Sequence, residues 1–243
     1  MRKFLLAALL MGIAVAVDAA NGTLCLTFDD IYFSSWLQNL PLFQKYNARA
    51  TFFISRRITE DVLEQMKKLQ DAGHSIGLHS ENHTRAVDYM QKFGSVNYIL
   101  NEIMPQLEIC KKNNIRIRAF AYPCSQRDKR TDQELFKTFD FLRTNSSEVK
   151  KWETPLAKAD GCFVKNVQAK QLFYGYPASG NFKVNEVKEA MKRAARENSV
   201  LVLYAHDITQ QMQPKNHITI DQLTILLEHA RKLGMAIRGM NEL

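Results

Sequence analysis

Two pairs of side chains and one further histidine have the types and spacing needed for metal and acid–base chemistry. Asp29 and Asp30 are adjacent, and His79 and His83 are four residues apart. One helical turn between the histidines would place both imidazoles on one face. Two imidazoles and one carboxylate form a divalent-metal site that leaves positions open for water and substrate. Either aspartate could be the ligand while the other approaches the water, and His206 could act as an acid across the substrate.

Each pattern also has an ordinary structural explanation. A His-x-x-x-His spacing often arises by chance, an Asp-Asp pair is usually a cap or a turn, and a histidine after a strand is often a hydrogen-bonded core residue. The hypothesis of an active site therefore depends on the patterns occurring together. These residues would lie together if one parallel α/β fold brought them all to the carboxyl ends of its strands.

Apolar, strand-like segments alternate with helical patterns along the chain. Strands are expected at Thr23–Phe28, Ala50–Ile54, Ser75–Leu78, Ile115–Ala121, Phe141–Thr144 and Val200–Ala205, with shorter ones near Gly161–Val167, Gln171–Tyr174 and Ala236–Arg238. Helices are expected at Ser34–Tyr46, from Thr59 to Gly73, and at Val96–Lys112 (interrupted by Pro105), Asp132–Phe139, Val184–Glu197 and Thr219–Leu233. Such units imply parallel strands with right-handed crossovers. We expect an α/β fold, a single-domain TIM-like (β/α)7 distorted barrel, with the polar residues at the carboxyl ends of its strands.

The first residues predict an export signal. Basic residues precede an apolar run, Phe4–Val17, which is followed by the small residues Ala19 and Ala20. This run is too short to span a bilayer and is typical of a signal peptide, so we expect a signal peptide at 1–19 and one domain at 20–243. The expected location is secreted, periplasmic or in the cell envelope. An uncleaved membrane anchor is the alternative.

Charge and cysteine content narrow the class of protein. The formal net charge is +8, but the basic residues are scattered and no nucleic-acid motif accompanies them, so no nucleic-acid partner is expected. Export would permit disulfides. The four cysteines allow three full pairings, and buried free thiols are an equally good interpretation (Cys25, Cys110, Cys124 and Cys162).

Four motifs give the chain a family resemblance. Leu26–Asp30 contains Thr-Phe-Asp-Asp, Ala48–Ile54 has a characteristic second-strand pattern, Gly73–His83 ends in His-Ser-x-x-His, and Leu203–His206 has the form Leu-x-x-His. In this order and spacing they resemble the polysaccharide deacetylases, the NodB-homology domains of carbohydrate esterase family 4. The resemblance covers residues 22–240.

The resemblance implies a role for each residue of the site. Asp30, His79 and His83 would bind the metal, Asp29 would be the general base, and His206 would be the general acid. Imidazole and carboxylate ligands suit Zn²⁺ best, with Co²⁺, Ni²⁺ or Fe²⁺ as alternatives.

Three further residues are expected at the substrate. Leu203 would line the pocket for the acetyl methyl group. The backbone N–H of Cys124, after the proline that follows Tyr122, would help to hold the oxyanion.

Two departures from the family pattern affect the expected activity. An arginine that orients the base often stands two residues before the proline of the third motif, where this chain has Ala121. Arg118 should face the other way on a regular strand, so Arg127 and Asp128 in the following loop are candidate replacements. The fourth motif, an aspartate that orients the acidic histidine and a tryptophan, has no clear match; Asp160 and Trp152 are the candidates.

The leading hypothesis is a secreted, metal-dependent hydrolase that removes N-acetyl groups from an amino-sugar polymer or oligomer. Peptidoglycan, chitin-type and exopolysaccharide substrates all remain open, as does the oligomeric state. The alternatives are an O-acetyl esterase of the xylan type, a hydrolase of small amides or cyclic imides, and a catalytically lapsed carbohydrate-binding protein.

Overall fold

Seven parallel strands form a closed barrel, which confirms the predicted fold class. The computed structural model describes residues 21–145, 154–213 and 215–243, so the predicted signal peptide and Trp152 lie outside the described residues. The barrel strands, in order around the ring, are β1 (Thr23–Asp30), β2 (Thr51–Ile54), β3 (Ser75–Leu78), β4 (Ile117–Ala121), β5 (Phe141–Asn145), β7 (Gln171–Pro177) and β8 (Val200–Ala205). Pairing of β1 with both β2 and β8 closes the ring.

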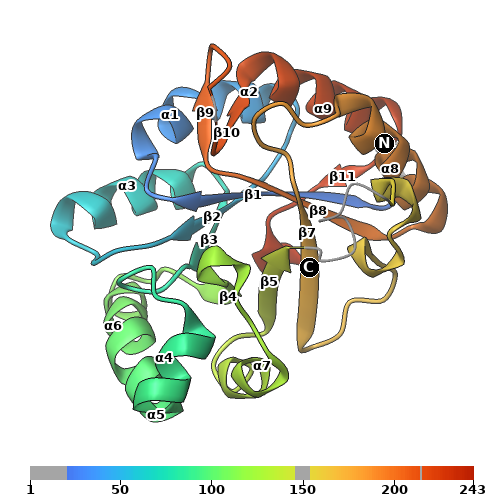
Figure 1. The fold of residues 1–243 in the computed structure, drawn as a ribbon. Helices are drawn as coiled ribbons and strands as arrows, with labels where there is room; N and C mark the ends of the chain where they lie inside the picture. Colours follow the sequence, from blue (N-terminus) through green and yellow to red (C-terminus); the bar gives the residue numbers. More distant parts are fainter. Residues whose placement is uncertain (1–20, 146–153, 214) are drawn as a thin grey trace, which may run out of the picture.

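Helices surround the barrel, with α4 to α7 gathered at the bottom of the view in Figure 1. They are α1 (Phe33–Gln38), α2 (Leu40–Lys45), α3 (Glu60–Asp71), α4 (Ala86–Phe93), α5 (Ser95–Tyr98), α6 (Met104–Lys112), α7 (Lys129–Leu135), α8 (Val184–Glu197) and α9 (Ile220–Lys232). A π-helical turn, η1 (Ile99–Ile103), joins α5 to α6. Short 3-10 turns lie at η2 (Pro123–Ser125), η3 (Leu156–Lys158), η4 (Asp160–Cys162) and η5 (Met240–Glu242).

Four short strands lie outside the ring. β11 (Ala236–Ile237) pairs in parallel with the amino end of β1, and β6 (Phe163–Val164) pairs antiparallel with β8. β9 (Asp207–Thr209) and β10 (His217–Thr219) pair with each other, and they lie at the top of the view in Figure 1.

Alternation along the strands creates two apolar cores. The larger one fills the space between the strands and the helices, and the smaller one fills the barrel, where Phe53, Ala119, Ala121, Phe173 and Val202 meet. Burial of this apolar surface is the main stabilising contribution to folding. β8 contributes to both cores, as expected of a continuous apolar strand buried on two faces.

Local sequence signals account for several helix boundaries. The Thr59 side chain accepts a hydrogen bond from the backbone N–H of Val62 and begins α3, as predicted. The predicted helix Ser34–Tyr46 is instead two helices, separated at Asn39 just before Pro41, because proline cannot donate the hydrogen bond that would continue α1. The expected interruption near Pro105 is the π-helical turn η1.

The cysteines do not form the pairings that the sequence left open. Cys25, Cys110 and Cys124 have free thiols, so none of the three full pairings is present. Burial raises the pKa of Cys25 and of Cys110 to about 12, which keeps both thiols protonated. Within the described residues, no helix combines the length and apolar character needed to cross a membrane.

Candidate active site and metal centre

Asp30, His79 and His83 meet at the carboxyl ends of β1 and β3. Oδ1 of Asp30 lies 3.7 Å from Nε2 of His83 and 4.0 Å from Nε2 of His79, and the ligand atoms of the three residues lie within 4.8 Å of one another. The two imidazole rings are 4.8 Å apart, centre to centre. In the described part of the chain, this is the one group of three such residues close enough to hold a metal ion.

His79 has the orientation and the protonation state that a metal ligand needs. Its Nδ1 lies 2.8 Å from the carbonyl oxygen of Ala121, so Nδ1–H donates to that carbonyl and the lone pair of Nε2 faces Asp30. Burial lowers the pKa of His79 from 6.5 to about 4, despite the nearby carboxylate of Asp29. The imidazole is therefore neutral at physiological pH, as metal binding requires.

The donor set fits a divalent metal ion. Two imidazole nitrogens and one carboxylate oxygen are ligand types that zinc and similar divalent ions accept, and the three residues could turn these atoms toward one ion. Asp30 is further held by a hydrogen bond of 3.3 Å from the Ser55 hydroxyl. Its backbone has a positive φ of 79°, which turns the chain at the end of β1 and gives the two adjacent aspartates different surroundings.

Asp29 points into the barrel, where its partner is Arg143 of β5. The arginine is 1% exposed and the aspartate 3%, and a guanidinium nitrogen of Arg143 donates to Oδ1 of Asp29. Burial acts to raise the pKa of Asp29, but the charge of Arg143, helped by His79 and His206, holds this pKa below its ordinary value. Asp29 is therefore an ionised carboxylate beside the candidate metal ligands Asp30, His79 and His83, which are called the metal-ligand group below.

Arg143 occupies a position built for a large cation. Its guanidinium lies 4.8 Å from the ring centre of Tyr204 and 5.3 Å from that of Phe53, so both aromatic rings stabilise its charge. Gly175 provides room, since a Cβ atom there would lie 3.2 Å from Cδ of Arg143 and 3.2 Å from the Tyr204 ring.

Arg143 is the functional residue that sequence reasoning missed, and it stands beside the position that lacks the family arginine. The ladder between β4 and β5 pairs Ala121 with Arg143 in register. The small side chain at Ala121 leaves the space that an arginine there would fill. The available signal was a charged residue in the middle of the predicted strand Phe141–Thr144.

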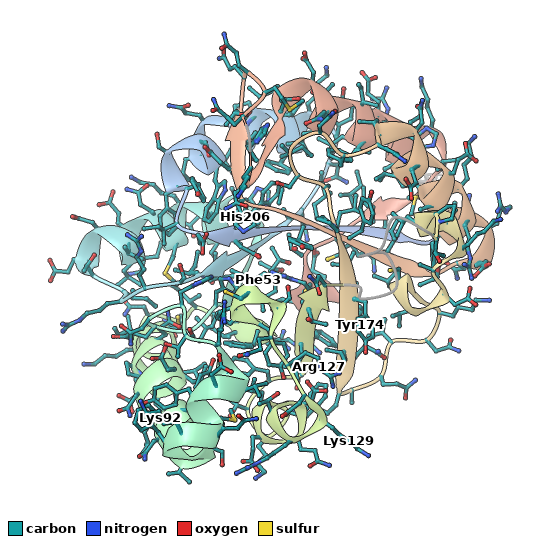
Figure 2. All side chains as sticks on the ribbon, in the orientation of Figure 1. Phe53, Lys92, Arg127, Lys129, Tyr174 and His206 are labelled. Carbon is teal, nitrogen blue, oxygen red and sulfur yellow. The ribbon has the colours of Figure 1, made fainter. Side chains whose placement is uncertain are left out.

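The candidate replacements in the loop after β4 are wrong. Arg127 forms an ion pair with Asp132 of α7, and Asp128 caps the same helix by accepting from the backbone N–H of Thr131. Figure 2 shows Arg127 beside α7, well separated from His206. Arg118 faces away from the site, as its position on the strand predicted, and forms an ion pair with Asp140.

His206 follows β8 and lies near Asp29, whose charge it influences. Its backbone carbonyl accepts a hydrogen bond of 2.7 Å from Nε1 of Trp36 on α1, which ties the segment after β8 to the segment after β1. Its Nδ1 is buried and has no hydrogen-bond partner among the described residues. Asp160, the candidate for orienting this histidine, instead pairs with Arg193 of α8 and is wrong for that role.

The three predicted substrate contacts differ in their placement. Cys124 is exposed in the turn after β4, and its backbone N–H makes no hydrogen bond to another described residue, so it is available to an oxyanion. Tyr122 is buried in the outer core, and its hydroxyl donates to Asp132 over 2.7 Å. Leu203 also packs in the outer core. The side chains of Tyr122 and Leu203 therefore face away from the site, because they point toward the helices rather than into the barrel.

A closed seven-stranded parallel barrel thus carries two histidines and two aspartates at the ends of its strands. The family model described as polysaccharide deacetylase matches residues 16–139, and the chain belongs to this family. A curated relative, the peptidoglycan-N-acetylmuramic acid deacetylase PdaA of Bacillus subtilis (strain 168), is 33% identical over 81 residues. That alignment covers 31% of this chain and 31% of PdaA, so it spans less than a third of the relative's length.

Solved structures agree on the fold. The chitin deacetylase of Colletotrichum lindemuthianum has a TM-score of 0.58 at 14% identity, with 93% of this chain and 88% of that chain covered. A carbohydrate esterase family 4 pseudoenzyme of Bacillus anthracis has a TM-score of 0.56 at 15% identity, with 91% of this chain and 64% of that chain covered. At these identities the likeness establishes the barrel and not the activity.

The first prediction concerns the metal ligands. His79→Ala and His83→Ala should each lower zinc content sharply, because each removes one of three protein ligands. Metal analysis after dialysis against Zn²⁺ would measure this, with His229→Ala on α9 as the control that retains full zinc. Full zinc in both site variants would show that the ion binds elsewhere.

The second prediction concerns the buried ion pair. Arg143→Met should lower the free energy of unfolding of the metal-free protein by about 3–5 kcal/mol, since it leaves the buried Asp29 carboxylate unpaired. Arg49→Met is the matched control: Arg49 pairs with Glu242 at the surface, so its loss should cost about 1 kcal/mol or less. Urea unfolding measures both values. Equal losses in the two variants would mean that the Arg143 pair contributes no more than a surface pair.

Proposed function

We propose that the protein is an exported, metal-dependent deacetylase that removes N-acetyl groups from an amino-sugar polysaccharide or oligosaccharide. The observation that carries the proposal is the meeting of an ionised Asp29 with Asp30, His79 and His83 at one end of the barrel, with His206 close by. Family membership supports a hydrolase that acts on acetylated carbohydrate. The signal predicted in residues 1–19 supports export.

The names of the relatives favour an N-acetyl substrate. PdaA is named for a deacetylation in peptidoglycan, and the Colletotrichum enzyme for one in chitin. At the rim of this site, Tyr32 exposes its ring two residues after Asp30 and packs edge-on against Trp36. An exposed aromatic ring beside the site suits the apolar face of a sugar.

The first step uses the two aspartates differently. A divalent metal at Asp30, His79 and His83, with Zn²⁺ as the best match for these ligands, would acidify a water and polarise the acyl carbonyl. In this proposal Asp29 takes the proton as the water oxygen attacks the carbonyl carbon; its ionised state beside Arg143 supports this role. The free N–H of Cys124 would stabilise the negative oxygen that develops.

The second step needs an acid. When the tetrahedral intermediate collapses, the C–N bond breaks, its electron pair goes to nitrogen, and acetate is released. An amine leaves readily only if its nitrogen gains a proton in this step. We assign that proton to His206, on the segment after β8.

The alternative of a lapsed enzyme rested on the missing arginine and on the fourth motif, which has no clear match. Arg143 stands beside Ala121 and pairs with Asp29, so the base retains a cationic partner. This supports an active enzyme, although a pseudoenzyme shares the fold. Release of acetate from N-acetylated glycan oligomers, and from acetylated xylan as the O-acetyl alternative, tests the proposal directly in zinc-loaded protein.

The third prediction separates the two aspartates. Asp29→Asn should retain zinc and lose about 10²-fold or more in kcat, because the change removes the base and leaves the ligands in place. Asp30→Asn should lose zinc as well as activity. Metal analysis and acetate release on the same samples measure both effects, and zinc loss in Asp29→Asn alone would reverse the two assignments.

The fourth prediction concerns His206 and the leaving group. His206→Ala should lower amide hydrolysis by about 10²-fold or more, since an unprotonated amine leaves poorly. An activated acetyl ester, whose leaving group needs no proton, should lose far less, and zinc content should stay unchanged. Comparison of kcat on the two substrates measures the difference. Undiminished amide turnover would remove His206 from the mechanism.

A further inference from the structure

The loop that carries His83 has a conformation that its residues do not favour. Ser80 and His83 have positive φ angles of 60° and 53°, in the left-handed region that non-glycine residues rarely adopt. Such a backbone persists only where surrounding contacts hold it. The Ser80 hydroxyl provides one contact by accepting from the backbone N–H of Thr84.

Glu102 provides three further contacts. One of its carboxylate oxygens accepts from the backbone N–H of Asn82 over 2.9 Å, and the other accepts from Nδ2 of Asn82 over 3.0 Å. Its backbone carbonyl accepts from the N–H of Glu81, also over 2.9 Å. One residue thus holds the two positions that precede His83.

Glu102 is buried, so its carboxylate depends on these hydrogen bonds. The residue is 2% exposed and lies in the π-helical turn η1. Among the described residues no lysine, arginine or histidine forms an ion pair with it, so the Asn82 donors satisfy its carboxylate. A buried carboxylate needs such donors. π-helical turns are rare and are often found at functional sites.

The two histidines depend on this support to different degrees. His79 is buried, and the Ala121 carbonyl fixes its ring. The His83 side chain is 41% exposed, and no described residue forms a hydrogen bond with its ring. The position of the His83 ring is therefore set mainly by the loop backbone.

We propose that Glu102 is a positioning residue for His83: through its two hydrogen bonds to Asn82, its carboxylate holds the loop in the conformation that presents His83 to a divalent metal ion. The inference rests on the proposed metal centre. It assigns Glu102 no contact with the metal or the substrate.

The experiment measures metal affinity in three variants. Glu102→Met keeps the buried volume but removes both acceptors, while the exposed Asn82 can still bond water, so the variant should fold. Glu102→Gln keeps an acceptor for the Asn82 backbone N–H and is the conservative rescue. Ile103→Ala is the matched control, since it opens a cavity in the same buried turn without touching a polar contact of the loop. Zn²⁺ affinity is measured by competition with a chromophoric chelator, and the Tm of each metal-free protein is recorded.

We expect Glu102→Met to weaken Zn²⁺ binding by about 10- to 100-fold, the usual effect of losing support for a metal ligand. Glu102→Gln should recover most of that loss. Ile103→Ala should lower Tm and leave the affinity unchanged. The Co²⁺ absorption spectrum should change in Glu102→Met and stay as in the unaltered protein in Ile103→Ala.

Two results would overturn the proposal: wild-type Zn²⁺ affinity in Glu102→Met, or an equal loss of affinity in Ile103→Ala, which would indicate general destabilisation. His79→Ala distinguishes this failure from failure of the metal centre itself. If His79→Ala loses zinc while Glu102→Met does not, only the role of Glu102 is wrong. If His79→Ala retains zinc, the metal centre is misplaced.

Discussion

The ion pair between Arg143 and Asp29 is the constraint around which the barrel interior is built. Moving two charges out of water costs several kcal/mol for each ion, about as much as the stability of many domains. The interior offsets this cost with two aromatic rings over the guanidinium and with small residues, Ala121 and Gly175, that leave it room. The result is a carboxylate held ionised next to Asp30, His79 and His83, where burial alone would have raised its pKa.

The barrel explains how Arg143 of β5 can pair with Asp29 when the motif position on β4 is Ala121. Side chains of neighbouring parallel strands at the same level point into the same interior, so Ala121 and Arg143 open onto one volume. Although this chain has Ala121 at the motif position, Asp29 has a cationic partner in Arg143 of the neighbouring strand.

The metal-ligand group combines one rigid and one dependent histidine. His79 is fixed by burial and by a hydrogen bond to the barrel, whereas the exposed ring of His83 relies on a loop held from outside by Glu102. The two supports come from different layers, one from β4 inside and one from the turn between α5 and α6.

The sequence alone determined the alternation of strands and helices, most of the barrel strands, and the residues Asp29, Asp30, His79, His83 and His206, because short-range periodicity and local motifs encode them. It did not determine which arginine faces Asp29, or that Glu102 supports the loop that carries His83. It also predicted Leu203 in the acetyl pocket and Tyr122 at the substrate, whereas both side chains pack in the outer core. The pair of Arg143 and Asp29 joins residues from β5 and β1, which the closed barrel brings together. The contact of Glu102 with Asn82 depends on how the segment between β3 and β4 folds back on itself.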